Sequence, residues 1–487
     1  ASGSNSTAIG RQANATAINT TALGFTAEAT ADESTAIGIN ATATGINSTA
    51  LGTNSDATQL NATAIGASAW ALGNQSTAYG AAANANANAG AALGAHAKAW
   101  ALDTTAVGTR AKAGAENGAE GIGATAVGRN ATANGNYSLA TGYGSTATGL
   151  NSTAIGARAE ATQTNATAIG EDSEATHGQT TAIGRQAKAT AWDATALGTV
   201  AKATDFRTTA LGVLSTASAR NATAIGAYSK ANANFTLAVG TNAAASGVAS
   251  IAFGAGSNAS DTGAIAKGVN AIASGANSSA LGTEAQATAE DALAVGHSAL
   301  ANKINATAIG AGAVAAKENA TAIGDKASAT GASSTSVGHG ATTNRHGASS
   351  LGHSASANAV RATALGSKSN AGGEDAIAVG WNANAIGEDA IAIGTSSVAN
   401  KLNAIAIGSD AQATKANATA FGDAAIASGN QSIAFGVNAS SSAHSSMALG
   451  HLANASQDDS MALGHNANAS GLVSLALGYT SRASGAN

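Results

Sequence analysis

The chain has 487 residues, of which 10% are charged, 3% are aromatic and 60 are glycine. A core of large apolar side chains cannot be built from this composition, so the fold must depend on closely approaching backbones with small side chains between them. The net charge of −5 is spread thinly, without a basic patch, and argues against nucleic acid as a partner. The absence of cysteine excludes disulfides and thiolate metal sites, and the absence of a long apolar stretch argues against membrane contact by this segment.

Glycine recurs every 14 residues along nearly the whole chain. The series begins at Gly10 and Gly24, takes one step of 20 residues from Gly108 to Gly128, and then holds its spacing to Gly478. So strict a period predicts a solenoid in which each repeat is one coil. We expect residues 1–487 to form one continuous domain of about 34 coils, with a six-residue insertion looped out between 108 and 128. Because neither end carries a capping sequence, we interpret the chain as a fragment of a longer protein.

Two alanine positions mark two similar halves in each coil. Counted from the repeat glycine, the minus-two residue is alanine in 32 of 34 repeats, with Ser336 and Ser350 as exceptions, and so is the plus-five residue, with Thr343 and Ser441 as exceptions. A heptad coiled coil is disfavoured, because a glycine in every second heptad would destabilise a helix by about 1 kcal/mol each. Alternation of period two predicts short strands whose alanines face a narrow lumen.

The opposite side of the first strand is apolar. The minus-one position usually holds isoleucine, leucine, valine or phenylalanine, and the minus-three position holds threonine or a large apolar residue. A continuous outward stripe of this kind indicates an interface, and self-association along the long axis is the expected use. The residues expected in this interface include Ile65, Ile169, Ile309, Ile391, Ile393 and Leu449.

The hexapeptides Asn5–Gly10, Asn47–Gly52 and Asn151–Gly156 read NSTAIG or NSTALG, and Ser250–Gly254 is a related variant. This pattern resembles the head repeats of YadA-type trimeric autotransporter adhesins over essentially the whole chain. The resemblance implies an all-β, left-handed parallel β-roll in which three chains pack side by side as a homotrimer. It further implies display outside the cell on a bacterial surface, with the anchor outside this segment, and binding to an extracellular matrix protein, a cell-surface glycan or other cells.

Two groups of residues are candidate metal ligands. His339 and His353 follow consecutive repeat glycines, so their rings should stack about 4.8 Å apart, and His451 and His465 do the same. Two consecutive coils also carry an acidic pair at the same position of the repeat, Glu374 with Asp375 and Glu388 with Asp389. A Ca²⁺ ion bridging the two pairs would reduce the repulsion between their charges. Ordinary polar turn residues are the better explanation of both groups, so we expect no bound metal.

Trp70 and Trp100 occupy outward positions of the second strand, where most coils carry a small polar residue. Exposed aromatic rings are candidate platforms for sugars, although a lone surface tryptophan commonly packs on its neighbours. Lys267 replaces the apolar residue before Gly268 and would bring three ammonium groups together in a trimer. Sequons such as Asn5-Ser6-Thr7 are frequent, because asparagine suits turns and threonine suits strands.

No catalytic constellation and no cofactor motif is recognisable, so we expect no enzyme. Three functions remain: an adhesin head, a structural segment of an extracellular fibre or spacer, and an ice-binding surface built from threonine ladders. The repeat pattern favours the adhesin.

Overall fold

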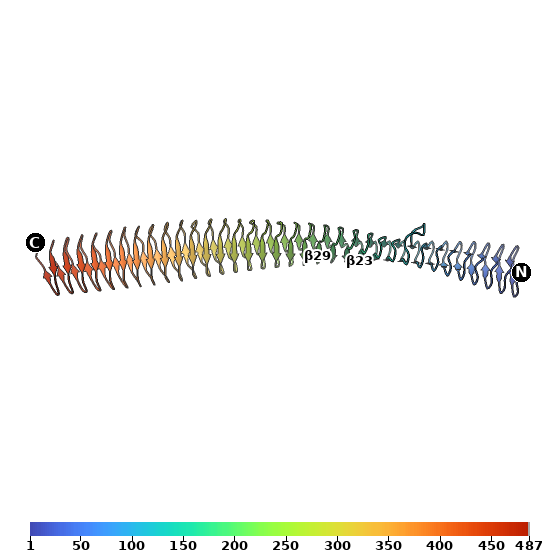
Figure 1. Ribbon diagram of the computed structural model, residues 1–487, viewed down its shortest axis with the longest axis horizontal. Coiled ribbons are helices and arrows are strands. Elements are labelled where there is room, and N and C mark those ends of the chain that lie inside the picture. Colours follow the sequence, from blue (N-terminus) through green and yellow to red (C-terminus); the bar gives the residue numbers. More distant parts are fainter. Residues whose placement is uncertain (486–487) are drawn as a thin grey trace. The chain divides into compact units, whose positions relative to one another are not determined.

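The computed structural model describes residues 1–485 as short parallel strands joined by tight turns (Figure 1). It divides into two compact units, one from Ala1 to Ser246 and one from Gly247 onward. The first unit runs from strand β1 (Thr7–Ile9) to β34 (Ala244–Ala245), and the second from β35 (Ile251–Phe253) to β68 (Arg482–Ala483). None of the described residues forms a helix long and apolar enough to cross a membrane.

Every coil contains two strands at fixed distances from the repeat glycine. Odd-numbered strands cover the three residues before the glycine, as in β21 (Thr153–Ile155) and β23 (Thr167–Ile169), which pair in parallel with alanine opposite alanine. Even-numbered strands cover the plus-four and plus-five residues, as in β22 (Glu160–Ala161) and β24 (Glu174–Ala175). The predicted all-β parallel solenoid with 14-residue coils is therefore confirmed.

The repeat glycine is required by both conformation and space. Gly310, for example, has φ of +133°, which only glycine adopts readily. A Cβ atom at Gly310 would lie 2.3 Å from the carbonyl oxygen of Gly324 in the next coil. A close contact of the same kind is found at repeat glycines from Gly10 to Gly464, so the column of glycines sets how closely successive turns approach.

Two further residues per coil, at plus two and minus five, have positive φ near 55°, as at Asn40 and Asn5. Asparagine tolerates this left-handed conformation better than most residues. The amide of Asn40 donates a hydrogen bond to the carbonyl of Phe25 in the preceding coil at 2.9 Å, so the turns are tied together as the strands are. This placement accounts for the frequent asparagines, and hence for many of the sequons, without invoking glycosylation.

The lumen is lined by four columns of small residues. The expected minus-two, plus-three and plus-five positions are buried, as at Ala22, Ala27 and Ala29, but the minus-four position is buried as well. Its members are alanine, serine or threonine, with glycine once, and most of the hydroxyl-bearing ones bond the nearby turn, as Ser34 Oγ does to the carbonyl of Ala31 at 2.6 Å. Most of the hydroxyl groups buried in the lumen therefore make their hydrogen bonds locally, whereas those of Ser48, Ser138, Ser152 and Ser250 have no partner.

The exceptions to the alanine columns bond one another or their neighbours. Ser336 and Ser350 hydroxyls lie 3.1 Å apart in adjacent coils, and Thr343 Oγ1 donates to Ser334 Oγ at 3.1 Å. Ser441 Oγ donates to a neighbouring backbone carbonyl at 2.8 Å. Polar substitution of the lumen is tolerated where each new hydroxyl gains a partner.

The insertion is confined to a single loop, Ala115–Glu120, whose ends are closed by a hydrogen bond from the Ala115 amide to the Glu120 carbonyl at 3.0 Å. The blue-green loop projects from the stack in Figure 1. Strands on either side of it, β15 (Thr105–Val107) and β17 (Thr125–Val127), still pair in register. The insertion therefore bulges between two strands that remain paired.

We predict that Gly310→Ala destabilises the surrounding coils by about 1–3 kcal/mol or more, because the new Cβ meets the backbone of Gly324 at a φ that alanine avoids. Gly312→Ala, two residues away, should destabilise these coils less, since alanine already occupies that left-handed turn position at Ala82 and Ala424. The two variants are compared by the hydrogen-exchange rates of β43 (Thr307–Ile309) and β45 (Thr321–Ile323) and by the midpoints of their unfolding in urea. Equal effects of the two substitutions would contradict this account of the glycine column.

Candidate interaction surfaces

The minus-one and minus-three columns form an outward apolar surface, here called the strand face. Its side chains point away from the buried alanines and lie in register, as Ile391 and Ile393 do with Ile405 and Ile407. Ile393 is 37% exposed and Leu449 43% exposed. The other residues that the sequence predicts for an interface are partly buried on the same face: Ile65, Ile169, Ile309 and Ile391. Their orientation is as expected, and their coverage by another chain stays a prediction.

The strand face is uneven and almost uncharged. One hollow is lined by Val337, Leu351 and Leu365 with smaller neighbours, among them Ser349. Another lies where Lys267 stands in register between Phe253 and Leu281. Lys267 is the one charged residue in the two columns that make up this face.

The first acidic pair, Glu374 and Asp375, is held by an arginine that the sequence analysis did not connect with it. Arg361 Nε and Nη2 donate to the two Asp375 carboxylate oxygens at 2.7 and 2.6 Å, and Nη2 also donates to Glu374 Oε1 at 2.8 Å. The hydrogen bond from Arg361 lowers the pKa of Asp375 below its ordinary value. The Arg361 guanidinium therefore supplies to Glu374 and Asp375 the positive charge that a bridging Ca²⁺ ion would supply.

The other proposed metal ligands lie on exposed turns. Glu388 and Asp389 sit one coil beyond Glu374 and Asp375, and no ion pair involves them within residues 1–485. The rings of His339 and His353 stack with centroids 5.1 Å apart, as the spacing predicts, and His339 Nε2 lies 3.2 Å from Asp325 Oδ2.

The second histidine pair, His451 and His465, also stacks, with centroids 4.9 Å apart. In the described part of the chain, no group of three or more histidine, aspartate or glutamate side chains is arranged to hold a metal ion. Metal binding at these turns therefore stays a hypothesis with no cluster to support it.

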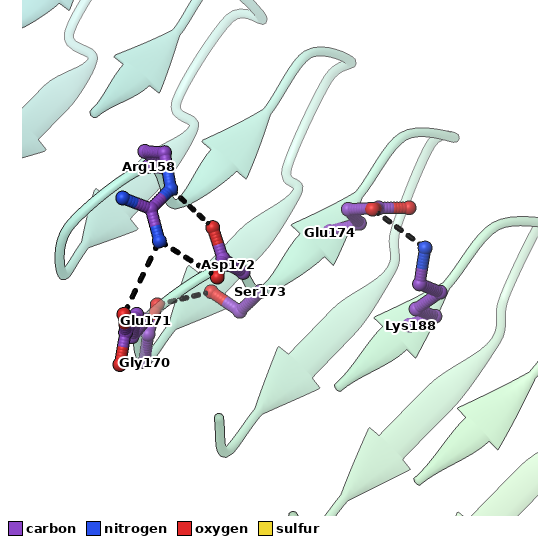
Figure 2. A network of polar contacts seen from close by, with 7 residues as sticks. All are labelled: Arg158, Gly170, Glu171, Asp172, Ser173, Glu174 and Lys188. Carbon is purple, nitrogen blue, oxygen red and sulfur yellow. Dashed lines mark hydrogen bonds and ion pairs between the residues drawn. The ribbon is translucent and has the colours of Figure 1, made fainter. Parts of the chain in front are cut away.

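A second arginine binds two acids of the next coil as Arg361 does, but on the other turn of the coil. We call each of these two clusters an arginine clasp. Figure 2 shows Arg158 reaching Asp172 at 2.5 Å and Glu171 at 3.2 Å, with Lys188 bound to Glu174 beside it at 2.7 Å. In both clasps, acids lie 13 and 14 residues after the arginine. A search for charge pairs one coil apart would have found both, whereas reading each repeat alone did not. Exposed pairs of this kind contribute little stability individually, and they fix the side chains of neighbouring turns.

The two tryptophans differ in exposure. Trp70 is 44% exposed, whereas Trp100 is only 9% exposed, so Trp100 packs on its neighbours and offers no open aromatic platform. Lys98 Nζ lies 4.5 Å from the centre of the Trp100 ring, and Gly118 of the insertion loop lies against the Trp100 backbone carbonyl. Trp100 is thus recessed beside the insertion loop, which repeat periodicity cannot reveal.

The expectation that the chain lacks a basic patch is wrong locally. His96, Lys98, Arg110 and Lys112 line one hollow, because Lys98 and Lys112 pair in register and the two others occupy the turn beside them. We call these four residues the basic patch. They are separated by 2, 12 and 2 residues in the sequence, and only the 14-residue coil brings them together.

Comparison with protein families gives repeated matches to the YadA head domain repeat, while the search of curated proteins returned no match. The longest unmatched stretch is 84–118. The matched residues are 1–27, 29–55, 57–83, 119–145, 147–173, 178–201, 203–229, 217–243, 245–271, 273–299, 301–327, 315–341, 346–369, 357–383, 385–411, 413–439, 441–467 and 469–487. The chain therefore belongs to the YadA head repeat family, the non-enzymatic head repeats of trimeric autotransporter adhesins on bacterial surfaces.

Proposed function

We propose that three copies of this chain pack through their strand faces and that the assembly is an extracellular adhesin head. The observation that carries the proposal is the continuous strand face, in which 32 of 34 minus-one residues are large and apolar or tyrosine. Monomeric proteins rarely leave an apolar surface of this extent open to water. The number three comes from the family.

The energetics support a permanent assembly. Fully burying one isoleucine or leucine side chain contributes about 1.5–3 kcal/mol, and tens of partly exposed residues line this face in each chain. The hollow beside Leu351 and Ser349 offers space for apolar side chains of a neighbouring copy. Lys267 would be the one charged group drawn into this interface, where its long side chain can reach solvent at the edge.

With the strand faces covered, the second strands and both turns remain for external contacts. These positions vary from coil to coil, from Trp70 to Lys98 to Glu174, while the lumen stays nearly constant. Variable residues on a constant scaffold are typical of binding surfaces. We therefore propose a matrix protein or a cell-surface glycan as ligand, contacted on the bacterial surface.

The interface is tested by replacing Ile391 and Ile393 together with aspartate. Six carboxylates would meet in the covered face of a trimer, so we predict local separation or dissociation of the assembly, seen by native mass measurement and by hydrogen exchange around β55 (Ile391–Ile393). The matched pair Thr146→Asp and Thr148→Asp, on the second strand, should leave the assembly intact. Equal disruption by both pairs would contradict the assignment of the interface.

Adhesion is tested by measuring binding of the purified assembly to immobilised collagen, laminin and fibronectin and to cultured cells. We predict saturable binding to at least one of these surfaces, with no binding to albumin. Absence of binding to every surface, by an assembly of the expected mass, would reject the adhesin and leave the structural spacer.

A further inference from the structure

The basic patch lies beside an exposed aromatic ring on the second-strand face. Trp70, Asn84, Lys98 and Lys112 follow one another in register along strands β10 (Trp70–Ala71), β12 (Asn84–Ala85), β14 (Lys98–Ala99) and β16 (Lys112–Ala113). A second hollow, lined by Trp70, Asn84, His96 and Lys98, adjoins the first and shares His96 and Lys98 with it. Ring and cations therefore border two adjoining hollows.

The cations of this patch are not neutralised by neighbouring acids. No carboxylate within residues 1–485 lies at ion-pair distance from Lys98, Arg110 or Lys112. Some cations elsewhere are paired with an acid in the adjacent coil, as Lys188 is with Glu174. Unpaired cations lining a hollow leave a local positive potential on a chain whose net charge is negative.

The insertion loop contributes to the geometry of this site. It follows Gly114, directly after β16, and the recessed Trp100 that it contacts holds Lys98 over its ring. The basic patch and the first four residues of the loop fall within residues 84–118, the longest stretch that the family model does not match. The departure from the repeat and the concentration of charge thus coincide.

We propose that Trp70 and the basic patch form a binding site for a sulfated glycan. The exposed face of Trp70 would pack against a sugar ring, and Lys98, Arg110 and Lys112 would donate charge-assisted hydrogen bonds to sulfate groups. This proposal deepens the adhesin function by naming a ligand class, and it rests on the arrangement in which the second-strand face stays exposed.

The short extent of the positive surface favours a glycan over a nucleic acid. Asp56 pairs in register with Trp70 at one end, and the loop carries Glu116 and Glu120 at the other. A strand with a phosphate at every step would meet these acids, whereas a glycan with spaced sulfates fits between them.

The test uses the full chain in its assembled form and heparin octasaccharide as probe, with binding measured by calorimetry at several salt concentrations. We expect Lys98→Gln with Lys112→Gln to weaken binding on the order of tenfold to a hundredfold and to flatten its salt dependence. Glutamine is compatible with this strand position, since Gln286 and Gln412 occupy it in other coils. Desulfated heparin, which keeps its carboxylates, should bind far more weakly.

Two control variants keep the result specific. Lys188→Gln with Lys202→Gln removes two cations from the same column and should leave the affinity unchanged. Trp70→Thr, with a residue found at this position in Thr42 and Thr132, should weaken binding several-fold without altering the salt dependence, and unchanged affinity would overturn the role of the ring.

No binding of heparin by the unmodified chain, or equal losses in both lysine pairs, would overturn the proposal. Single-stranded DNA that displaces heparin at equal charge concentration would reject the glycan in favour of a general polyanion site. Native mass measurement of the same samples distinguishes failure of the glycan site from failure of the trimer. A monomer that still binds heparin through Lys98 would support the glycan site and contradict the trimer.

Discussion

The close approach of successive backbones at the repeat glycine governs this architecture. A glycine with φ near +130° lets the chain turn out of the first strand, and its missing side chain admits the carbonyl of the next coil. Because the same turn is repeated at each step within a unit, strands and turns are both held in register by hydrogen bonds between coils. Such an array is stabilised by neighbour contacts, so a local error affects neighbouring coils first.

A narrow coil has room only for small side chains inside, and this has a functional consequence. Nearly every buried position is alanine, serine or threonine, so large residues such as Ile393 and Trp70 must point outward. The interior then contributes little side-chain burial per coil, and the strand face supplies the large apolar surface that can be covered by self-association. The remaining outward positions are free to vary, which is where the basic patch arises.

The fold was predictable because the signals that define it repeat. The glycine spacing predicted the coil length. The alanine columns and the period-two alternation predicted the strands and the outward orientation of Ile391 and Ile393. Two features formed between neighbouring coils were missed, the clasp of Arg361 on Asp375 and the gathering of Lys98 with Lys112, although the stacking of His339 on His353 at the same separation was predicted. The recess of Trp100 was also missed, because it lies beside the one loop that breaks the period.

The claim on which the functional account depends is that the strand face is covered by other copies of the chain. Native mass measurement of the unmodified protein at low concentration tests it most directly. The account predicts a folded species of three times the chain mass of 46.0 kDa. A stable, folded monomer that keeps its β structure would contradict the interface, the trimer and the adhesin head built on them.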